Sequence, residues 1–130
     1  MSSNTQLSVV YIVEADEALS LSMKCLLELH NFHVVTVTDE EDLLENRSIN
    51  EKDIVLMELH EARPKRFHLL NKLMKTTHQP AIILMTALRS VLRPTDIFKG
   101  ERIKILTQPI LPQNLLETIS SVELRGETPA

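Results

Sequence analysis

The sequence predicts an α/β fold in which a parallel sheet lies between two layers of helices. Short apolar runs bounded by polar residues alternate with segments whose apolar residues recur at helical spacing. The runs are nearly continuous, which is typical of strands buried on both faces of a parallel sheet. Because right-handed crossovers place the connecting helices on both faces, the alternation indicates a doubly wound sandwich of five β–α units.

Five segments have the length and composition of strands. Four are predominantly apolar and are expected to be buried: residues 8–13 (SVVYIV), 53–59 (DIVLMEL), 81–87 (AIILMTA) and 103–108 (IKILTQ). The fifth, residues 33–38 (HVVTVT), alternates apolar and polar positions. We therefore expect that strand to lie nearer to an edge of the sheet.

Two helical patterns lie in the first third of the chain. Residues 17–30 repeat apolar side chains every three or four positions, and the predicted stripe consists of Leu19, Met23, Leu26, Leu27 and His30. Cys25 lies in the same segment beside two leucines, so we expect it to be buried as a small apolar residue. In residues 38–46, Thr38 is the predicted N-cap of a capping box with Glu41.

Three more helices are predicted in the second half of the chain. Residues 66–77 carry leucines and a methionine at helical spacing. Residues 94–100 (PTDIFKG) form a short pattern that begins with proline, which suits the first turn of a helix. Residues 112–124 begin in the same way and continue with apolar residues three or four apart. These helices complete the β–α alternation.

The composition indicates one globular domain. The chain has 130 residues, of which 43% are hydrophobic, and no apolar run reaches the roughly 20 residues of a membrane helix, so we expect a cytoplasmic protein. We assign residues 1–124 to the domain and residues 125–130 (RGETPA) to a polar tail or the start of a linker. The net charge of −4 disfavours nucleic-acid binding. We interpret the basic run at residues 63–66 as the solvated start of a helix.

Polar side chains stand where four of the predicted strands end. Ligands of open α/β sheets bind at the carboxyl ends of the parallel strands. The residues at these ends are Glu14 and Asp16, Glu58, Thr86 and Gln108. Each of them alone would be an ordinary polar residue at a solvated strand end. Together they predict that two acids, a hydroxyl and an amide, with Asp16 beside them, converge on one edge of the sheet.

The motifs around these residues resemble those of response regulator receiver domains, the CheY-like superfamily of bacterial two-component signalling. VYIVEADEAL resembles the first strand of the family with its acidic pair, and DIVLMEL the strand of its phosphorylated aspartate. ILMTA resembles the strand of the switch hydroxyl, and LTQP resembles Leu-x-Lys-Pro. The resemblance covers about residues 8–124. It implies the flavodoxin-like receiver fold, (βα)5, with a sheet of strand order 2-1-3-4-5.

In a typical receiver, the acidic pair and the aspartate bind a divalent metal, and a histidine kinase donates a phosphoryl group to the aspartate. Mg²⁺ prefers hard oxygen ligands, and a transferred phosphoryl group is stabilised by nearby cations. Carried over to this chain, the resemblance makes Glu14 and Glu58 the candidate metal ligands. It makes Thr86 the switch hydroxyl.

The chain departs from the family at most of these positions. Ala15 supplies no ligand where the second acid of the pair is expected, and Asp16 would face away from the site in an extended strand. Glu58 stands at the acceptor position with its carboxylate one methylene farther from the backbone. Gln108 stands at the lysine position and brings no positive charge, so we expect three acids without a fixed cation nearby.

Two further positions lack features of the family's switch. Ile105 stands where the family often has tyrosine or phenylalanine, so the aromatic side chain that would follow Thr86 inward is missing. The segment after Glu58, LHEARPKR, lacks the family's Met-Pro and glycine pattern. Arg66 stands where a glycine is common.

These departures predict a degenerate receiver, or pseudo-receiver, that acts by protein–protein contact independently of phosphorylation. We expect no enzymatic activity and no cofactor, with weak Mg²⁺ binding at Glu14 and Glu58 left open. Glu58 either mimics the negative charge of a phosphorylated aspartate or is a solvated carboxylate.

Two alternatives remain. The first is a phosphorylatable receiver that uses Glu58 or Asp16 with a relaxed metal site, and that forms the N-terminal part of a DNA-binding transcriptional regulator. The second is a flavin- or nucleotide-binding protein of the same fold class. No glycine-rich loop follows the first strand, however, and the acidic segment EADEALS would repel a phosphate.

The resemblance also implies where a protein partner binds. The usual partner surface of the family is formed by the fourth helix, the fifth strand and the fifth helix. In this chain that surface would include Arg93, Asp96, Lys99, Glu101, Lys104 and Gln113. We expect a protein partner there, or a histidine kinase under the first alternative, and neither membrane nor direct nucleic-acid binding. Homodimerisation through the fourth and fifth helices is left open.

Overall fold

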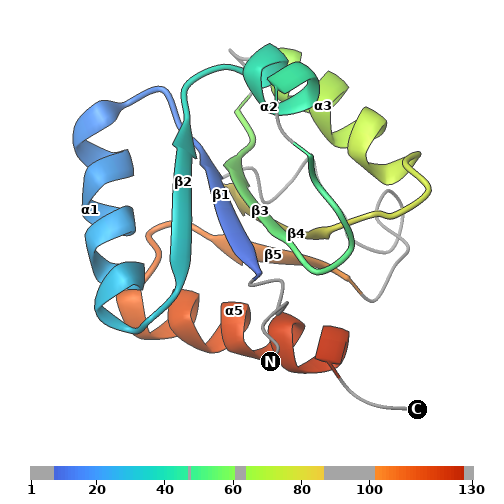
Figure 1. The fold of residues 1–130 in the computed structure, drawn as a ribbon. Coiled ribbons are helices and arrows are strands. Elements are labelled where there is room, and N and C mark those ends of the chain that lie inside the picture. Colours follow the sequence, from blue (N-terminus) through green and yellow to red (C-terminus); the bar gives the residue numbers. More distant parts are fainter. Residues whose placement is uncertain (1–7, 47, 61–63, 87–101, 128–130) are drawn as a thin grey trace.

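A single parallel sheet forms the centre of the molecule (Figure 1). The structure is a computed structural model, and it describes residues 8–46, 48–60, 64–86 and 102–127. The strands are β1 (Val9–Val13), β2 (His33–Val37), β3 (Ile54–Glu58), β4 (Ala81–Thr86) and β5 (Ile103–Thr107). They pair in the order β2-β1-β3-β4-β5, which confirms the predicted fold class and strand order.

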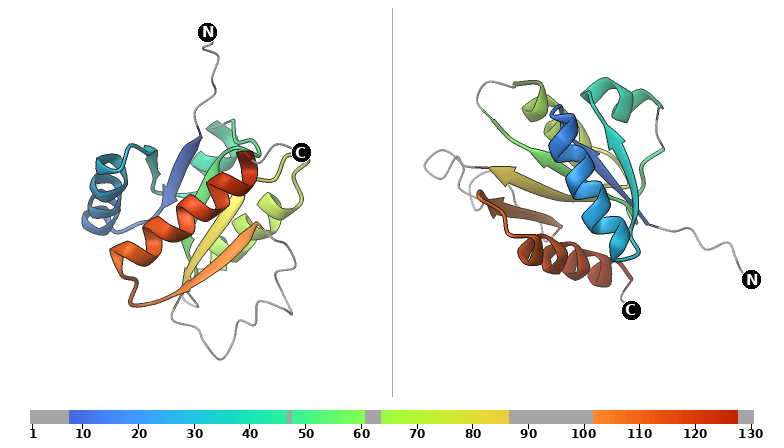
Figure 2. Two further views of the ribbon diagram at one scale, coloured as in Figure 1. Left: turned by 90° about the horizontal axis from the view of Figure 1, so that it is seen from below. Right: turned by 90° about the vertical axis from the view of Figure 1, so that its left-hand side faces the viewer.

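Helices cover both faces of the sheet (Figures 1 and 2). They are α1 (Glu17–Leu29), α2 (Glu40–Asn46), α3 (Pro64–Met74) and α5 (Pro112–Glu127). The figures show α1 and α5 on one face and α2 and α3 on the other. The helix predicted at residues 94–100 lies outside the described residues. No helix of the described part of the chain is long and apolar enough to span a membrane.

The core has two layers because successive side chains of a strand point to opposite faces of the sheet. Val10 and Ile12 of β1 pack toward α1 and α5. Tyr11 and Val13 pack toward α2 and α3. Both layers are predominantly aliphatic. The side chains of β3 and β4 are buried on both faces up to Met57 and Thr86. A continuous apolar run in the sequence therefore corresponds to a strand in the middle of the sheet.

The two edge strands were predicted with different success. The alternating segment forms β2 at one edge, as expected. We expected β5 to be buried, but its residues from Ile103 to Leu106 are only half-buried. The reason is its position, because β5 pairs with β4 alone and forms the other edge of the sheet.

Three expectations about helix α1 were wrong, and one of them is His30, which we placed on the buried stripe but which follows the helix and is exposed. Its core-facing residues are Ser20, Met23 and Leu27. Cys25 is exposed, because it lies two positions from both Met23 and Leu27 and so points away from the core. Leu19, which we placed on the buried stripe, is 42% exposed.

The N-cap of helix α2 was predicted one residue too early. The Asp39 carboxylate accepts a hydrogen bond from the backbone N–H of Asp42 at 2.8 Å. Helix α2 begins at Glu40, so the cap is Asp39 and not Thr38. Threonine and aspartate are both good caps, and the sequence alone did not decide between two adjacent candidates.

Asp53 joins the amino ends of three strands, at the edge of the sheet opposite the predicted site. Its side chain is buried, and its two carboxylate oxygens accept hydrogen bonds from the backbone N–H groups of Val9 and Asn50, each at 3.0 Å. Its own carbonyl accepts a hydrogen bond from Ala81 N–H at 3.0 Å. Asp53 therefore holds the starts of β1, β3 and β4 in register.

Candidate functional site

Glu14 follows strand β1 and is buried, with only 5% of the residue exposed. One carboxylate oxygen, Oε2, accepts a hydrogen bond from the backbone N–H of Asp16 at 3.1 Å. The other, Oε1, is buried without a hydrogen-bond partner among the described residues. The side chain of Glu14 is thus turned back onto the loop between β1 and α1.

Asp16 caps helix α1. Its Oδ1 accepts a hydrogen bond from Leu19 N–H at 3.1 Å, and its carbonyl accepts one from Ser20 N–H at 2.9 Å. The side-chain bond satisfies a donor that the first turn of a helix leaves free, and the backbone bond is the first hydrogen bond of the helix itself. Ala15 lies between Asp16 and Glu14 and offers no side-chain ligand. The second acid of the loop is therefore used to start a helix.

Replacing Asp16 tests this role. We expect Asp16→Ala to lower the free energy of unfolding by about 1 kcal/mol, because the cap is lost. Asp16→Asn is the matched control and should keep most of the stability, since the asparagine carbonyl also caps. Urea denaturation with and without Mg²⁺ measures the free energy of unfolding of the wild type and of both variants. An equal loss in the two variants, or stabilisation of the wild type by Mg²⁺ that disappears in both, would point to a charge-dependent role instead.

Glu58 and Gln108 lie together, as the sequence predicted for the carboxyl edge of the sheet. Gln108 Nε2 donates a hydrogen bond to Glu58 Oε2 at 3.2 Å, and both residues are half-buried. The backbone N–H of Gln108 donates to Thr86 O at 2.9 Å, and a cis peptide bond joins Gln108 to Pro109. A neutral amide therefore contacts the Glu58 carboxylate at the position where the resemblance places a lysine.

Thr86 and Ile105 occupy the two neighbouring strands. Thr86 ends β4 and is 3% exposed. Ile105 lies in β5, pairs with Leu84, and is half-buried against the core layer of α2 and α3. The side chain at the aromatic-switch position is thus an aliphatic residue that packs on the sheet.

Arg66 is a residue that the sequence reasoning misinterpreted. It is 1% exposed, although we expected the basic run at residues 63–66 to be solvated. Its Nε forms a salt bridge with Glu40 Oε2 at 2.7 Å, and its Nη1 donates to the carbonyl of Glu58 at 3.1 Å. A buried cation therefore contacts the backbone of Glu58, which corrects the expectation that no fixed cation is nearby.

The signal for a buried Arg66 was present in the sequence. Arg66 precedes Leu69, Leu70 and Leu73 by three, four and seven residues, which places it on the buried face of α3. We had predicted Arg66 to be solvated because of its charge and had not considered its position on the helix. Through its contacts with Glu40 and with the carbonyl of Glu58, this side chain links α3, α2 and β3.

The acids of this edge do not fit a divalent metal. Mg²⁺ requires several oxygen ligands in a near-octahedral arrangement. Asp16 is engaged at the helix start, Ala15 has no donor, and one oxygen of Glu58 is bonded to Gln108. Across the described residues, no group of three or more histidine, cysteine, aspartate or glutamate side chains is placed to hold a metal ion. A metal ion at Glu14 and Glu58 would therefore have at most two protein carboxylates as ligands.

The predicted partner surface is only partly described. Lys104 in β5 is half-buried, and Gln113 in the first turn of α5 is exposed. The other four residues that we assigned to this surface, Arg93, Asp96, Lys99 and Glu101, lie outside the described residues.

Comparisons with known proteins show what fold this chain has. No protein-family model matches the sequence, and no curated protein matches it. A response regulator from Colwellia psychrerythraea superposes with a TM-score of 0.75 at 21% identity, over 92% of this chain and 99% of that one.

Two receiver domains of known structure superpose on this chain about as well. A response regulator receiver domain protein from Clostridium thermocellum gives a TM-score of 0.73 at 18% identity, with 92% of this chain and 96% of that chain covered. A CheY-like receiver domain from Methylobacillus flagellatus gives 0.70 at 21% identity, with 91% and 100% covered. The structural similarity and the order of the strands in the sheet agree with one another. The chain has the fold of a response regulator receiver domain.

Proposed function

We propose that this domain is a pseudo-receiver, a module of two-component signalling that acts by binding another protein and does not depend on phosphorylation. The receiver fold supports the general role. The observation that carries the finer proposal is the hydrogen bond from Gln108 Nε2 to Glu58 Oε2 at 3.2 Å. Under the resemblance to receivers, this neutral amide and this longer acid stand where phosphoryl transfer would need a lysine and an aspartate.

The surroundings of Glu58 argue against phosphoryl transfer. The transferred group is stabilised mainly by cations placed around its oxygens, and Gln108 carries no charge. The buried guanidinium of Arg66 is paired with Glu40 and with the backbone carbonyl of Glu58. The extra methylene of Glu58 also shifts the reacting oxygen, and a displacement of about 1 Å is enough to cost roughly 100-fold in rate.

In this proposal Glu58 is a permanent acidic group that takes the place of a phosphorylated aspartate. The support is geometric, because the Glu58 carboxylate reaches from the end of β3 to the side chain that follows β5. A phosphorylated aspartate would reach a lysine there in the receivers that this chain resembles. We also propose a cytoplasmic protein without enzymatic activity or cofactor, whose net charge of −4 disfavours nucleic acid.

A phosphodonor experiment tests the proposal. The wild-type protein is incubated with acetyl phosphate and Mg²⁺, or with beryllofluoride and Mg²⁺, and its intact mass and NMR spectrum are recorded. We expect no phosphoryl mass shift and no Mg²⁺-dependent beryllofluoride complex.

The matched control restores the three positions at which the chain departs from its resemblance. The variant Ala15→Asp, Glu58→Asp, Gln108→Lys is expected to gain Mg²⁺-dependent spectral changes and a phosphoryl adduct. An authentic phosphorylatable receiver in a parallel reaction verifies the donor. A stoichiometric adduct on Glu58 or Asp16 of the wild-type chain would contradict the proposal and favour a phosphorylatable receiver.

A further inference from the structure

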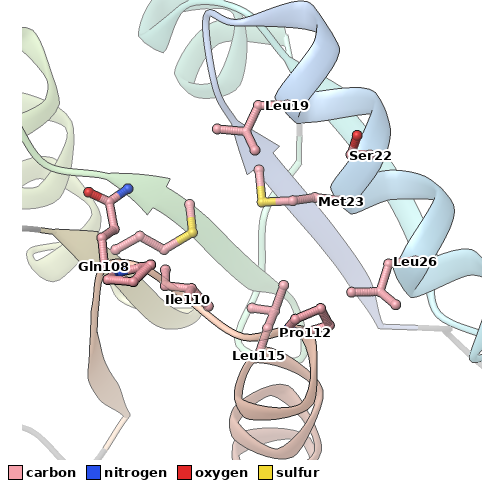
Figure 3. A pocket seen from close by; sticks show the side chains of 10 residues that line it. Leu19, Ser22, Met23, Leu26, Gln108, Ile110, Pro112 and Leu115 are labelled. Carbon is pink, nitrogen blue, oxygen red and sulfur yellow. The ribbon is translucent and has the colours of Figure 1, made fainter.

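Two pockets lie beside helix α1 in the described part of the chain. The pocket on the side of α5 is lined mainly by apolar side chains, among them Leu19, Met23 and Leu26 (Figure 3). The second pocket lies between α1 and β2, has a volume of about 320 Å³, and is lined mainly by polar side chains. Charged groups line the α1–β2 pocket and do not line the first one.

The walls of the α1–β2 pocket come from one flank of α1 and one face of β2, which lie side by side in Figure 1. Thr36 of β2 lies two positions after Val34, which packs in the core layer of α1 and α5, so both side chains point to the α1 side of the sheet. The lining residues of α1 occur at positions i, i+3, i+4 and i+7 and therefore share one flank of the helix: Glu17, Ser20, Leu21 and Lys24.

Glu14 is the buried charged residue of this pocket. Its backbone N–H donates to Val37 O at 3.2 Å, which extends the ladder between β1 and β2 by one residue. Because side chains alternate along a strand, Glu14 points to the same face as Ile12, toward α1. Its Oε1 is buried and has no hydrogen-bond partner among the described residues. A buried carboxylate oxygen without a donor is unfavourable, so the pocket contains an acceptor that a ligand can satisfy.

Two further charges stand at opposite ends of the pocket. Glu17 and Lys24 are seven residues apart on α1, which separates their Cα atoms by about 10 Å. Glu17 begins the helix, three residues after Glu14, and Lys24 lies two turns farther along. Neither Glu17 nor Lys24 forms an ion pair within the part of the chain that the structure describes. The pocket is therefore acidic at one end and basic at the other.

These charges are complementary to a small molecule with an ammonium group at one end and a carboxylate at the other. An ammonium suits Glu14 better than a guanidinium does. A guanidinium binds a carboxylate through both oxygens, and Oε2 of Glu14 already accepts a hydrogen bond from Asp16 N–H. The carboxylate of the ligand would pair with Lys24. The volume of the pocket is at the lower end of the range of small-molecule sites.

We propose that the α1–β2 pocket binds a small aminocarboxylate, with its ammonium group at Glu14 and Glu17 and its carboxylate at Lys24. Since Oε1 of Glu14 is enclosed, the carboxylate turns about its last side-chain bond to meet the ligand, and the preferences of that torsion are broad. The inference goes beyond the proposed function and is independent of it, because neither Glu58 nor Gln108 lines this pocket.

The test compares three probes of equal chain length. They are ω-aminohexanoate, which carries both charges, hexylamine, which carries the ammonium alone, and hexanoate, which carries the carboxylate alone. Binding to the full chain is followed by NMR through the ¹³C-labelled methyl groups of threonine, with EDTA present to remove metal ions. Thr36 and Thr38 line the pocket, whereas Thr76 follows α3 and Thr118 lies on α5, and these two serve as internal controls.

We expect ω-aminohexanoate at millimolar concentration to shift the methyl resonances of Thr36 and Thr38 and to leave those of Thr76 and Thr118 in place. Hexylamine should bind several-fold more weakly, because it makes no contact with Lys24. Hexanoate should shift none of the four, since it has no group for Glu14.

Neutral variants of nearly the same shape test each charge. Glu14→Gln keeps an acceptor for Asp16 N–H and so should fold, and it is expected to weaken the binding of ω-aminohexanoate and of hexylamine roughly tenfold or more. Lys24→Gln should lower the affinity for ω-aminohexanoate to that of hexylamine and leave hexylamine unchanged. Glu45→Gln on α2 and Lys72→Gln on α3 make the same chemical changes at exposed positions on the other face of the sheet, and should alter neither.

Three results would overturn the inference. They are the absence of shifts of Thr36 and Thr38 with ω-aminohexanoate, equal binding of hexanoate, and binding that Glu14→Gln leaves unchanged. If Glu14→Gln does not fold, which the resonance of Thr76 would show, the comparison of Lys24→Gln with the wild type decides alone. A phosphoryl adduct on Glu58 bears on none of these results, so failure of this inference and failure of the proposed function are distinguishable.

Discussion

Arg66→Ala is expected to lower the free energy of unfolding by about 3 kcal/mol, the largest effect among the substitutions considered. The arginine is 1% exposed and forms a 2.7 Å salt bridge with Glu40, whose side chain is 16% exposed. Removal of the guanidinium leaves Glu40 without its counter-charge and the Glu58 carbonyl without this donor. It also leaves a cavity in the packing of α3 against the sheet. Urea denaturation followed by circular dichroism measures the loss.

A double-mutant cycle separates the charge from the packing. Arg66→Met fills most of the volume but leaves Glu40 unpaired, so it should remain clearly destabilised. Adding Glu40→Leu removes the remaining charge, and the double variant is expected to recover much of the stability, because an apolar pair of similar volume is often as stable as a buried ion pair. A loss below about 1 kcal/mol for Arg66→Ala would show that water replaces the guanidinium at no great cost.

Asp53→Ala is expected to lower the free energy of unfolding by about 2–3 kcal/mol. The buried carboxylate accepts hydrogen bonds from two backbone N–H groups, those of Val9 and Asn50, at 3.0 Å each. A hydrogen bond to a charged group contributes about 1.5–3 kcal/mol. Both donors lose their partner, but Asn50 is exposed, so water can replace the carboxylate at its N–H and the total stays near the value of one such bond. The effect should appear as a reduced midpoint of urea denaturation.

Asp53→Asn is the matched control for this substitution. Asparagine has nearly the same shape but only one acceptor oxygen, so it should keep one of the two bonds and lose about half as much stability as alanine. Because Asp53 lies at the amino edge of the sheet, neither variant should alter the response to phosphodonors. Equal destabilisation by alanine and asparagine would mean that the negative charge, and not the number of acceptors, stabilises this edge.

The fold followed from the sequence because each central strand is a continuous apolar run, and such a run has few alternatives to a buried parallel strand. The positions of the edge strands were harder to predict. Strand β2 carries a visible alternation, whereas the apolar residues of β5 gave no indication that it lies at the edge. The predicted N-cap of α2 was one residue too early. Thr38 and Asp39 are both acceptable caps, and only the backbone geometry decides between them.

The site was predicted less completely than the fold. The end-of-strand rule correctly brought Glu58 and Gln108 together, since it depends only on topology. Arg66 was missed because a charged residue was assumed to be solvated, although its helical position matched three buried leucines. Its partner Glu40 lies 26 residues earlier on another helix. A pairing of that kind has no local signature in a single sequence.

The hydrogen bond between Gln108 and Glu58 has a consequence for timing. A phosphorylated aspartate carries information for as long as the acyl phosphate survives, so its lifetime limits the duration of a response. The carboxylate of Glu58 is encoded in the chain and persists from folding until proteolysis. Under the proposed function, no phosphatase terminates the signal. The duration of the signal is then set by the synthesis and degradation of the protein. In a phosphorylated receiver it is set by the half-life of the acyl phosphate.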